Sequence, residues 1–441
     1  MSSDRFDALV TETASLAIEF TKAEKRIYLV GGIVRDTLLG RVRAELDIDL
    51  TTDALPDEIE AIVKKCRPTA LWTQGKRFGT IGATITGSTG PRAVEITTHR
   101  AEQYHDDSRK PEVRFSTDIT LDLSRRDFTV NAMAFDLQTL ELLDPFDGQQ
   151  DLTNRVLRTP LSPEISFRDD PLRMLRASRF LAGLQLTADP DLLEAVVVHG
   201  HRMSIVSAER VRGELVKLLT LRDPSNGVRF LASTNLLQVI VPEMQNDSID
   251  LAIRRIQLVD HDDWLLRLVA LGWDAFATEK SVRTRLRALK CSTVEELWAG
   301  MLFRMKSVDL TKTAATDADA RRFVKAAGDA RKPFLALKRA DVLALLEVAD
   351  QSARQSADTL AALEARIAAL AESENIEDLS PELDGDAVMS LLDLPPGRSV
   401  GDALAVLLEI RLNEGPLGRE EETRRLRSWW QEHHRPQSIG S

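Results

Sequence analysis

The hydrophobic pattern of this chain changes once, between residues 150 and 160, and this change decides the fold class. Before it, short apolar runs with strand-like character predominate, at 27–30, 46–50, 80–85, 93–97, 132–137 and 140–143. After Pro160, apolar residues recur every three or four positions, which is typical of amphipathic helices. The pattern therefore predicts an α+β protein, in which a small mixed sheet domain is followed by an all-α part.

A glycine pair follows the first apolar run. Gly31 and Gly32 stand between the strand-like residues 27–30 and a predicted helix over 33–39. Glycine lets the backbone turn closely around a bulky anion, and the free amides at the start of a helix favour a phosphate. This arrangement predicts a nucleotide-binding turn.

Two aspartates stand just downstream of the glycine pair. Asp47 and Asp49 alternate with the apolar residues of 46–50, so a strand places both carboxylates on one face. Such a pair can hold two Mg²⁺ ions that activate an attacking hydroxyl and stabilise departing pyrophosphate. Taken singly, each motif is read more simply as a turn or as solvated surface, because short motifs match by chance. Their occurrence together and in order favours nucleotidyl transfer.

A basic run precedes the predicted strand 132–137. In Arg125-Arg126-Asp127, Arg126 is suited to a triphosphate, and Asp127 or Asn131 to a ribose hydroxyl. The simpler interpretation is a surface cluster of ion pairs. Glu95, in the strand-like run 93–97, is a candidate to supplement the metal-binding aspartates.

A third charged motif opens the helical part. Asp169 is a predicted N-cap with Pro171 in the first helical turn. Four charged residues then recur at intervals of three: Asp170, Arg173, Arg176 and Arg179. This spacing places them along one side of the helix, away from Leu172, Leu175 and Phe180. An ion-paired solvent face is the simpler interpretation. A carboxylate beside a guanidinium, however, presents an acceptor and donors that can pair with a base edge, which makes Asp170 and Arg173 candidates for reading a nucleobase.

Charge and cysteine content limit the partners and the compartment. The net charge of −11 argues against nucleic acid, but basic residues gather in one helical region: Arg168, Arg173, Arg176, Arg179, Arg202, Arg210, Arg212 and Lys217. Cys66 and Cys291 have neither metal-binding spacing nor a redox motif, so neither is a catalytic candidate and a reducing cytoplasm is expected. The sequence has no signal-peptide core and no apolar stretch of about 18 residues, which predicts a soluble protein without membrane contact.

The motifs together resemble the bacterial-type CCA-adding tRNA nucleotidyltransferases and their poly(A) polymerase relatives. The matching pieces are Leu-Val-Gly-Gly-Ile-Val-Arg-Asp from Leu29, Asp-Ile-Asp from Asp47, Glu-Ile-Thr-Thr-His-Arg from Glu95, Arg-Arg-Asp-Phe-Thr-Val-Asn-Ala from Arg125 and Asp-Asp-Pro-Leu-Arg-Met-Leu-Arg from Asp169. They cover roughly residues 27–220 in the family's order. A weaker match over 383–401 is similar to the family's helical tail.

The resemblance implies a polymerase-β-like head followed by a helical neck, body and tail. We predict a head over 1–150, a neck over 151–225, a body over 226–330 and a tail over 331–441. It implies that Gly32 and Arg35 contact the triphosphate and that Asp47 and Asp49 bind Mg²⁺. It also implies that Asp170 and Arg173 select CTP and then ATP without a nucleic-acid template. The remaining residues assigned to the nucleotide are Gly31, Arg126, Asp127, Asn131, Arg176 and Arg179.

Two departures from the family qualify this assignment. Asp169 stands where the family usually has glutamate. Some relatives carry a metal-binding His-Asp phosphohydrolase domain after the neck, but Trp273 stands where its histidine is expected, and His261 and Asp262 alone are too few ligands. We therefore expect no phosphohydrolase activity.

The predicted function is template-independent addition of CCA to the 3′ end of tRNA from CTP and ATP, with Mg²⁺ as cofactor and no evident protein partner. The segment 99–117 matches the family's flexible loop, linked to the switch from C to A addition, and its presence argues against an enzyme that adds only CC. An enzyme that adds only CC or only the final A, a poly(A) polymerase and an inactive RNA-binding protein remain alternatives. The intact set Asp47, Asp49, Glu95 and Arg126 argues against the last.

Overall fold

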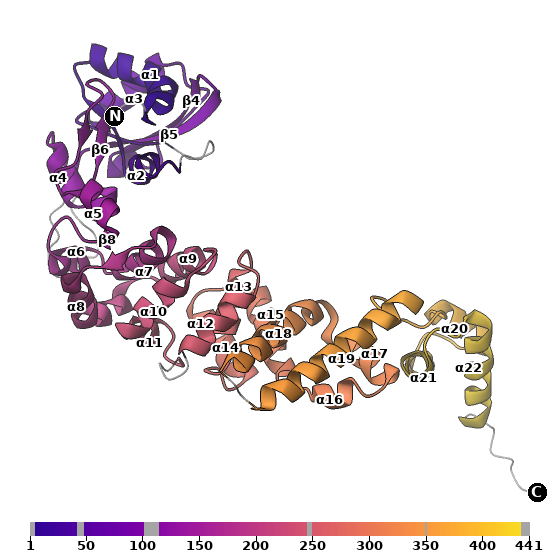
Figure 1. Cartoon of the computed structure of the whole chain (residues 1–441). Helices are drawn as coiled ribbons and strands as arrows, with labels where there is room; N and C mark the ends of the chain where they lie inside the picture. The colour runs from indigo at the N-terminus through magenta and orange to yellow at the C-terminus, as the bar shows by residue number, and fades with distance from the viewer. Residues whose placement is uncertain (1–4, 42–47, 101–113, 245–248, 349–350, 434–441) are drawn as a thin grey trace, which may run out of the picture. The chain divides into compact units, whose positions relative to one another are not determined.

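The computed structural model describes residues 5–41, 48–100, 114–244, 249–348 and 351–433. Within them the chain forms two compact units, residues 1–242 and 243–441. The first contains a mixed sheet and helices and the second is helical, so the predicted α+β class is confirmed (Figure 1).

In the described part of the first unit the sheet has seven strands, in the order β3-β4-β5-β2-β1-β6-β7. The strands are β1 (Ile27–Val30), β2 (Ile48–Thr52), β3 (Ala70–Trp72), β4 (Thr80–Gly87), β5 (Gly90–Thr98), β6 (Ala134–Asp136) and β7 (Leu142–Leu143). Only β2 and β5 pair in parallel among these neighbours, and Asp49 pairs with Glu95 in their register.

The two faces of the sheet differ, as strand alternation requires. The helices of this part are α1 (Asp7–Lys22), α2 (Gly32–Leu38), α3 (Pro56–Lys65), α4 (Ile119–Ser124) and α5 (Gly148–Asn154), with 3₁₀ turns η2 (Lys76–Phe78) and η3 (Thr129–Asn131). α1 and α3 cover one face, where Ile48, Leu50 and Ile96 join their apolar side chains in the main core (Figure 1). Tyr28 and Val30 point to the other face and pack with Leu123 of α4. The face opposite the main core is therefore the one left for polar residues of β2 and β5.

The structure corrects several predicted elements. Residues 132–137 form a strand only from Ala134, because 129–131 make a 3₁₀ turn and Ala132 ends it with φ −99° and ψ 38°. The strand expected over 140–143 is limited to β7, because Leu140 has the left-handed φ of 61°. β3 was not predicted, since three residues are too few to display alternation.

The rest of the first unit is helical apart from one short strand pair. Its helices are α6 (Pro163–Asp169), α7 (Leu172–Leu184), α8 (Pro190–His199), α9 (Ala208–Leu219), α10 (Ser225–Ser233) and α11 (Leu236–Ile240), with the 3₁₀ segment η4 (Gly200–Ile205). β8 (Val156–Leu157) pairs in parallel with β9 (Thr187–Ala188), so the prediction of helix alone after Pro160 was wrong at this point.

The second unit consists of helices in the residues that the structure describes. They are α12 (Ile249–Leu258), α13 (Trp264–Leu271), α14 (Glu279–Ala288), α15 (Thr293–Met305), α16 (Leu310–Thr313), α17 (Asp317–Ala327), α18 (Arg331–Glu347), α19 (Gln351–Ser373), α20 (Gly385–Leu392), α21 (Arg398–Glu414) and α22 (Arg419–His433), with the 3₁₀ turn η6 (Gly328–Ala330). Two separate apolar groups illustrate its packing: Trp273 and Phe276 contact Phe303, and Leu407 and Leu426 are buried between α20, α21 and α22.

Candidate active site

Asp49 and Glu95 lie side by side on the sheet face opposite the main core. Both side chains are exposed, whereas their strand neighbours Ile48, Leu50, Val94 and Ile96 are buried. They occupy paired positions on parallel strands, and neighbouring strands run roughly 4.8 Å apart. The structure therefore brings together two of the predicted acidic residues. Asp47 lies outside the described residues.

A cavity of about 340 Å³ opens beside these two carboxylates. Its other lining residues are Val30, Leu50, Thr51, Thr80, Thr97, Arg100, Asp122, Arg125 and Arg126. Asp49 and Glu95 stand on the sheet side of the cavity. Arg100, Arg125 and Arg126 form another side, which we call the arginine wall. The cavity therefore offers both cation ligands and donors for an anion.

Asp122 on α4 accepts hydrogen bonds from all three residues of the arginine wall. Its Oδ1 accepts from the Arg100 amide at 3.2 Å and from Arg125 Nε at 3.4 Å, and its Oδ2 accepts from Arg126 Nη2 at 3.2 Å. Burial raises the pKa of the Asp122 carboxyl, but Arg126, Arg125 and His99 together lower it by more, so its pKa lies below the ordinary value. Asp122 is therefore an ionised carboxylate at neutral pH, although its side chain is only 2% exposed.

The glycine turn touches this wall. Gly31 has a φ of 76°, a conformation that side chains with a Cβ rarely adopt, and a Cβ there would lie 3.1 Å from Arg126 Nη1. At Gly32 the nearest atom to such a Cβ is Arg35 Nη2, at 3.4 Å. The predicted turn thus lies between Arg126 of the cavity and Arg35.

Arg35 begins a second group of predicted residues, which does not line the cavity. Arg35 Nη1 donates to Asn131 Oδ1 at 2.5 Å, and Asn131 Nδ2 donates to Asp127 Oδ1 at 2.9 Å. Arg176 Nε then donates to Asp127 Oδ2 at 3.0 Å. Burial raises the pKa of the Asp127 carboxyl, but Arg176 and Asn131 lower it by more, and the net shift is downward. Residues from α2, η3 and α7 are therefore joined in one buried network.

Glu214 on α9 extends this network to Arg179. Its Oε2 accepts from Arg179 Nε at 2.7 Å, and its Oε1 lies 3.6 Å from Arg176 Nη1. The Phe180 ring lies under three guanidinium carbons, at 4.3 Å from Arg179, 5.4 Å from Arg35 and 5.7 Å from Arg176. The prediction that Phe180 faces away from the arginines was therefore wrong, because its ring turns back to pack against them.

The predicted base-reading pair lies where α6 meets α7. Asp170 Oδ2 accepts from Arg210 Nη2 at 2.7 Å, whereas Arg173 Nη1 donates to Ser166 Oγ at 2.9 Å and Arg173 Nη2 to the Arg125 carbonyl. The prediction that Asp169 caps this helix was wrong, because Asp169 is the last residue of α6. Pro171 is the N-cap residue of α7, and Asp170 just before it accepts at Oδ1 from the Leu172 amide at 3.1 Å.

Four residues of this region were absent from the predicted set: Arg100, Asp122, Arg125 and Glu214. Asp122 stands three and four residues before Arg125 and Arg126, a helical spacing that the sequence displays. Glu214 had no such signal, because its partners Arg176 and Arg179 lie 38 and 35 residues away in the chain. Only the packing of α9 on α7 reveals it.

Known proteins are similar to this chain over two segments of the first unit and beyond. Residues 27–158 match the poly A polymerase head domain, and residues 185–247 match the probable RNA and SrmB-binding site of polymerase A. A CCA-adding enzyme of Levilactobacillus brevis is 37% identical over 257 residues, which are 57% of this chain and 61% of that protein. Over these residues the chain is similar to the CCA-adding enzymes and poly(A) polymerases.

Solved structures of CCA-adding enzymes extend the similarity along the chain. The Bacillus stearothermophilus CCA-adding enzyme in complex with CTP is 25% identical, with a TM-score of 0.71 over 97% of this chain and 99% of that one. The Thermotoga maritima CCA-adding enzyme complexed with tRNA_CCA shares the fold at 20% identity, with a TM-score of 0.66 over 96% of this chain and 94% of that one. By sequence alone, this chain spans about half to three fifths of the curated CCA-adding enzymes that it matches.

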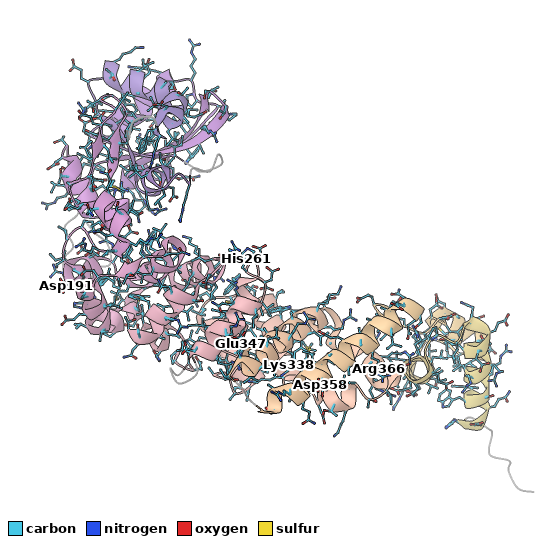
Figure 2. All side chains as sticks on the ribbon, in the orientation of Figure 1. Asp191, His261, Lys338, Glu347, Asp358 and Arg366 are labelled. Carbon is cyan, nitrogen blue, oxygen red and sulfur yellow. The ribbon has the colours of Figure 1, made fainter. Side chains whose placement is uncertain are left out.

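Nucleotidyltransferases of this family generally use a divalent metal ion. Asp49 and Glu95 suit such an ion, because oxygen ligands from carboxylates are those that hard cations prefer. In the second unit, Asp260, His261 and Asp262 also approach one another, but all three are exposed. Figure 2 labels His261 of this group. The side chains of Trp273 and Arg267 are buried. No helix in the described ranges has the length and apolar character needed to span a membrane.

Proposed function

We propose that this chain is a template-independent nucleotidyltransferase that adds C, C and A to the 3′ end of tRNA from CTP and ATP. The observation that carries the proposal is the cavity in which Asp49 and Glu95, paired in register, face Arg126 beside the Gly31 turn. Relatives that are CCA-adding enzymes, one of them solved with CTP, support the choice of substrates. A tRNA substrate agrees with a cytoplasmic location.

In the proposed reaction the terminal hydroxyl of the RNA attacks the α-phosphorus of the bound nucleotide and pyrophosphate leaves. Asp49 and Glu95, with Asp47, would hold Mg²⁺. When bound, Mg²⁺ lowers the pKa of the attacking hydroxyl and stabilises the charge on the triphosphate. Arg126 donates to phosphate oxygens, and the turn at Gly31 leaves room for them because no Cβ projects there.

Base choice is assigned to Asp170 and Arg173. Asp170 offers an acceptor and Arg173 offers donors, which complement the amino donor and the ring-nitrogen acceptor that cytosine and adenine both present. Both side chains are partly exposed and are held by protein partners, Arg210 for Asp170 and Ser166 for Arg173. Nucleotide binding would exchange these partners for the base. The division into head, neck, body and tail at residues 150, 225 and 330 is part of the same proposal.

The test is extension of three tRNA transcripts that end before CCA, after C and after CC, with labelled CTP, ATP and Mg²⁺. Growth of all three to CCA is expected. Growth only from the CC end would make the protein an A-adding enzyme, stalling at CC would make it a CC-adding enzyme, and long A tracts on unrelated RNA would make it a poly(A) polymerase. Metal-dependent protection of bound nucleotide separates all of these from an inactive RNA-binding protein, which should show none.

A further inference from the structure

We propose that Asp122 is a positioning residue of the nucleotide site, whose buried carboxylate fixes the Arg125 and Arg126 side chains on the cavity wall facing Asp49 and Glu95. This inference rests on the proposed function, because it assigns the two arginines to the triphosphate. It adds Arg125 to the phosphate-binding residues and gives Asp122 a part in nucleotide affinity.

Asp122 accepts from three donors, which occupy three of the roughly four acceptor sites of a carboxylate. Both carboxylate oxygens are used: Oδ1 by the Arg100 amide and Arg125 Nε, and Oδ2 by Arg126 Nη2, at 3.2 to 3.4 Å. The residue is 1% exposed, although it borders the cavity. A carboxylate engaged in this way holds arginines in place and has little capacity left for a metal ion.

This arrangement keeps the long side chains of the arginines ordered before a ligand binds. An arginine loses up to about 2 kcal/mol of rotamer freedom when it is fixed. Because Asp122 holds Arg125 and Arg126 in place already, nucleotide binding does not have to order them again. One buried negative charge among Arg100, Arg125 and Arg126 also leaves the wall positive, which suits an anion with several charges.

Glu12 provides a matched control within the same unit. It is another buried carboxylate that holds an arginine and a backbone amide: its Oε1 accepts from the Thr89 amide at 3.0 Å and its Oε2 from Arg92 Nε at 3.4 Å. Glu12 belongs to α1 and contacts the β4–β5 hairpin through Thr89 and Arg92, and none of these three residues lines the cavity. Loss of its charge perturbs the sheet domain without touching the arginine wall.

The experiment is titration of the full-length protein with CTP and Mg²⁺ in the absence of RNA, by calorimetry, for the wild type, Asp122→Asn and Glu12→Gln. We expect Asp122→Asn to weaken CTP binding about tenfold, the effect of losing one charge-assisted contact, and Glu12→Gln to change it by less than about twofold. Unchanged binding in Asp122→Asn, or an equal loss in Glu12→Gln, overturns the proposal. If Asp122→Asn does not fold, Asp122→Glu, which keeps the charge but displaces both arginines, is expected to show the same loss, and normal affinity in it overturns the proposal.

A double-mutant cycle tests whether Asp122 acts through Arg126. In an Arg126→Ala background the further loss from Asp122→Asn should shrink to about threefold or less, because one of the side chains that it positions is gone. Full additivity contradicts the inference. A raised Mg²⁺ requirement in Asp122→Asn would also overturn it, by making Asp122 a metal ligand. Since RNA is absent, a wild type that binds CTP but extends no tRNA would refute the proposed function and leave this inference standing.

Discussion

Substitution of Asp49 and of Glu95 tests whether each carboxylate of the cavity holds the metal ion. Asp49→Asn and Glu95→Gln should lower kcat for nucleotide incorporation at least about a hundredfold, because each removes an anionic oxygen that would hold the metal ion, a loss of about 3 kcal/mol. Both side chains are exposed, so the melting temperature should change little. Asp57→Asn, an exposed carboxylate on α3, is the control. Substantial turnover in either cavity variant would refute the assignment.

The Asp127–Arg176 pair is predicted to matter for stability as well as for the nucleotide. Arg176→Ala leaves the buried Asp127 carboxylate without its charged partner, which should lower the free energy of unfolding by about 3 kcal/mol in urea at pH 7. The double variant Asp127→Asn with Arg176→Ala should recover part of this loss, because no unpaired charge remains. A double variant less stable than the single one would contradict this account.

His99 is predicted to make the first unit sensitive to acid. Burial lowers the pKa of its imidazole from 6.5, against the opposing influence of Asp122 and Asp53. Between the lower folded pKa and pH 6.5, the unfolded state therefore binds a proton that the folded state does not. His99 thus leaves the free energy of unfolding unchanged above pH 6.5 and lowers it as pH falls toward the folded pKa. In His99→Gln the slope of unfolding free energy against pH, measured just below pH 6.5, should fall by up to about 1.4 kcal/mol per unit. An unchanged slope would show that His99 does not titrate on unfolding.

How far the sequence predicts the site depends on whether its residues are neighbours in the chain. Alternation along β2 and β5 places Asp49 and Glu95 on one face, and the structure confirms that placement. The pairing of Arg176 with Asp127 joins residues 49 positions apart, and no local pattern encodes such a distance. Asp122 was overlooked although its spacing is local, because a carboxylate before two arginines is also what an exposed ion-paired helix displays.

Among the elements, long periodic segments were predicted better than short ones. α1, α7 and α19 follow the apolar period of the chain, and β4 and β5 follow its alternation. The errors fall on β3, β7 and the β8–β9 pair, whose two or three residues are too few for a period to be read. The Asp169 error has a similar cause, because α6 and α7 are separated only by Asp170 and Pro171 and either aspartate suits a cap.

The contact of α10 with α7 gives a test of packing between elements. A Cβ at Gly227 would lie 2.3 Å from the Ser178 carbonyl oxygen and 2.7 Å from Leu218 Cδ1. Gly227→Ala should therefore force α10 away from α7 and α9 and cost about 2 kcal/mol of stability, measured by chemical denaturation. Gly213→Ala on α9 is the control: a Cβ there meets nothing within 4 Å, so the better helix former should stabilise by up to about 1 kcal/mol. Equal behaviour of the two variants would contradict the packing argument.

The chain divides after Pro242 into two compact units. The cavity, the arginine wall and the buried network all belong to residues 1–242. The second unit has its own buried ion pairs, such as Arg321 and Glu374, and its own apolar cores. Each unit thus has the buried residues that a separate folding transition requires.

The last prediction follows from this division. Calorimetry of the full chain should resolve two unfolding transitions, and CTP with Mg²⁺ at about a hundred times its Kd should stabilise only the first unit, by about 2.7 kcal/mol. The Gly227→Ala variant identifies that transition independently, because it lowers the stability of the first unit alone. The same transition should therefore move down in the variant and up with nucleotide. If a single transition is seen instead and CTP shifts all of it, the units unfold as one, and binding at the cavity is coupled to the stability of the second unit.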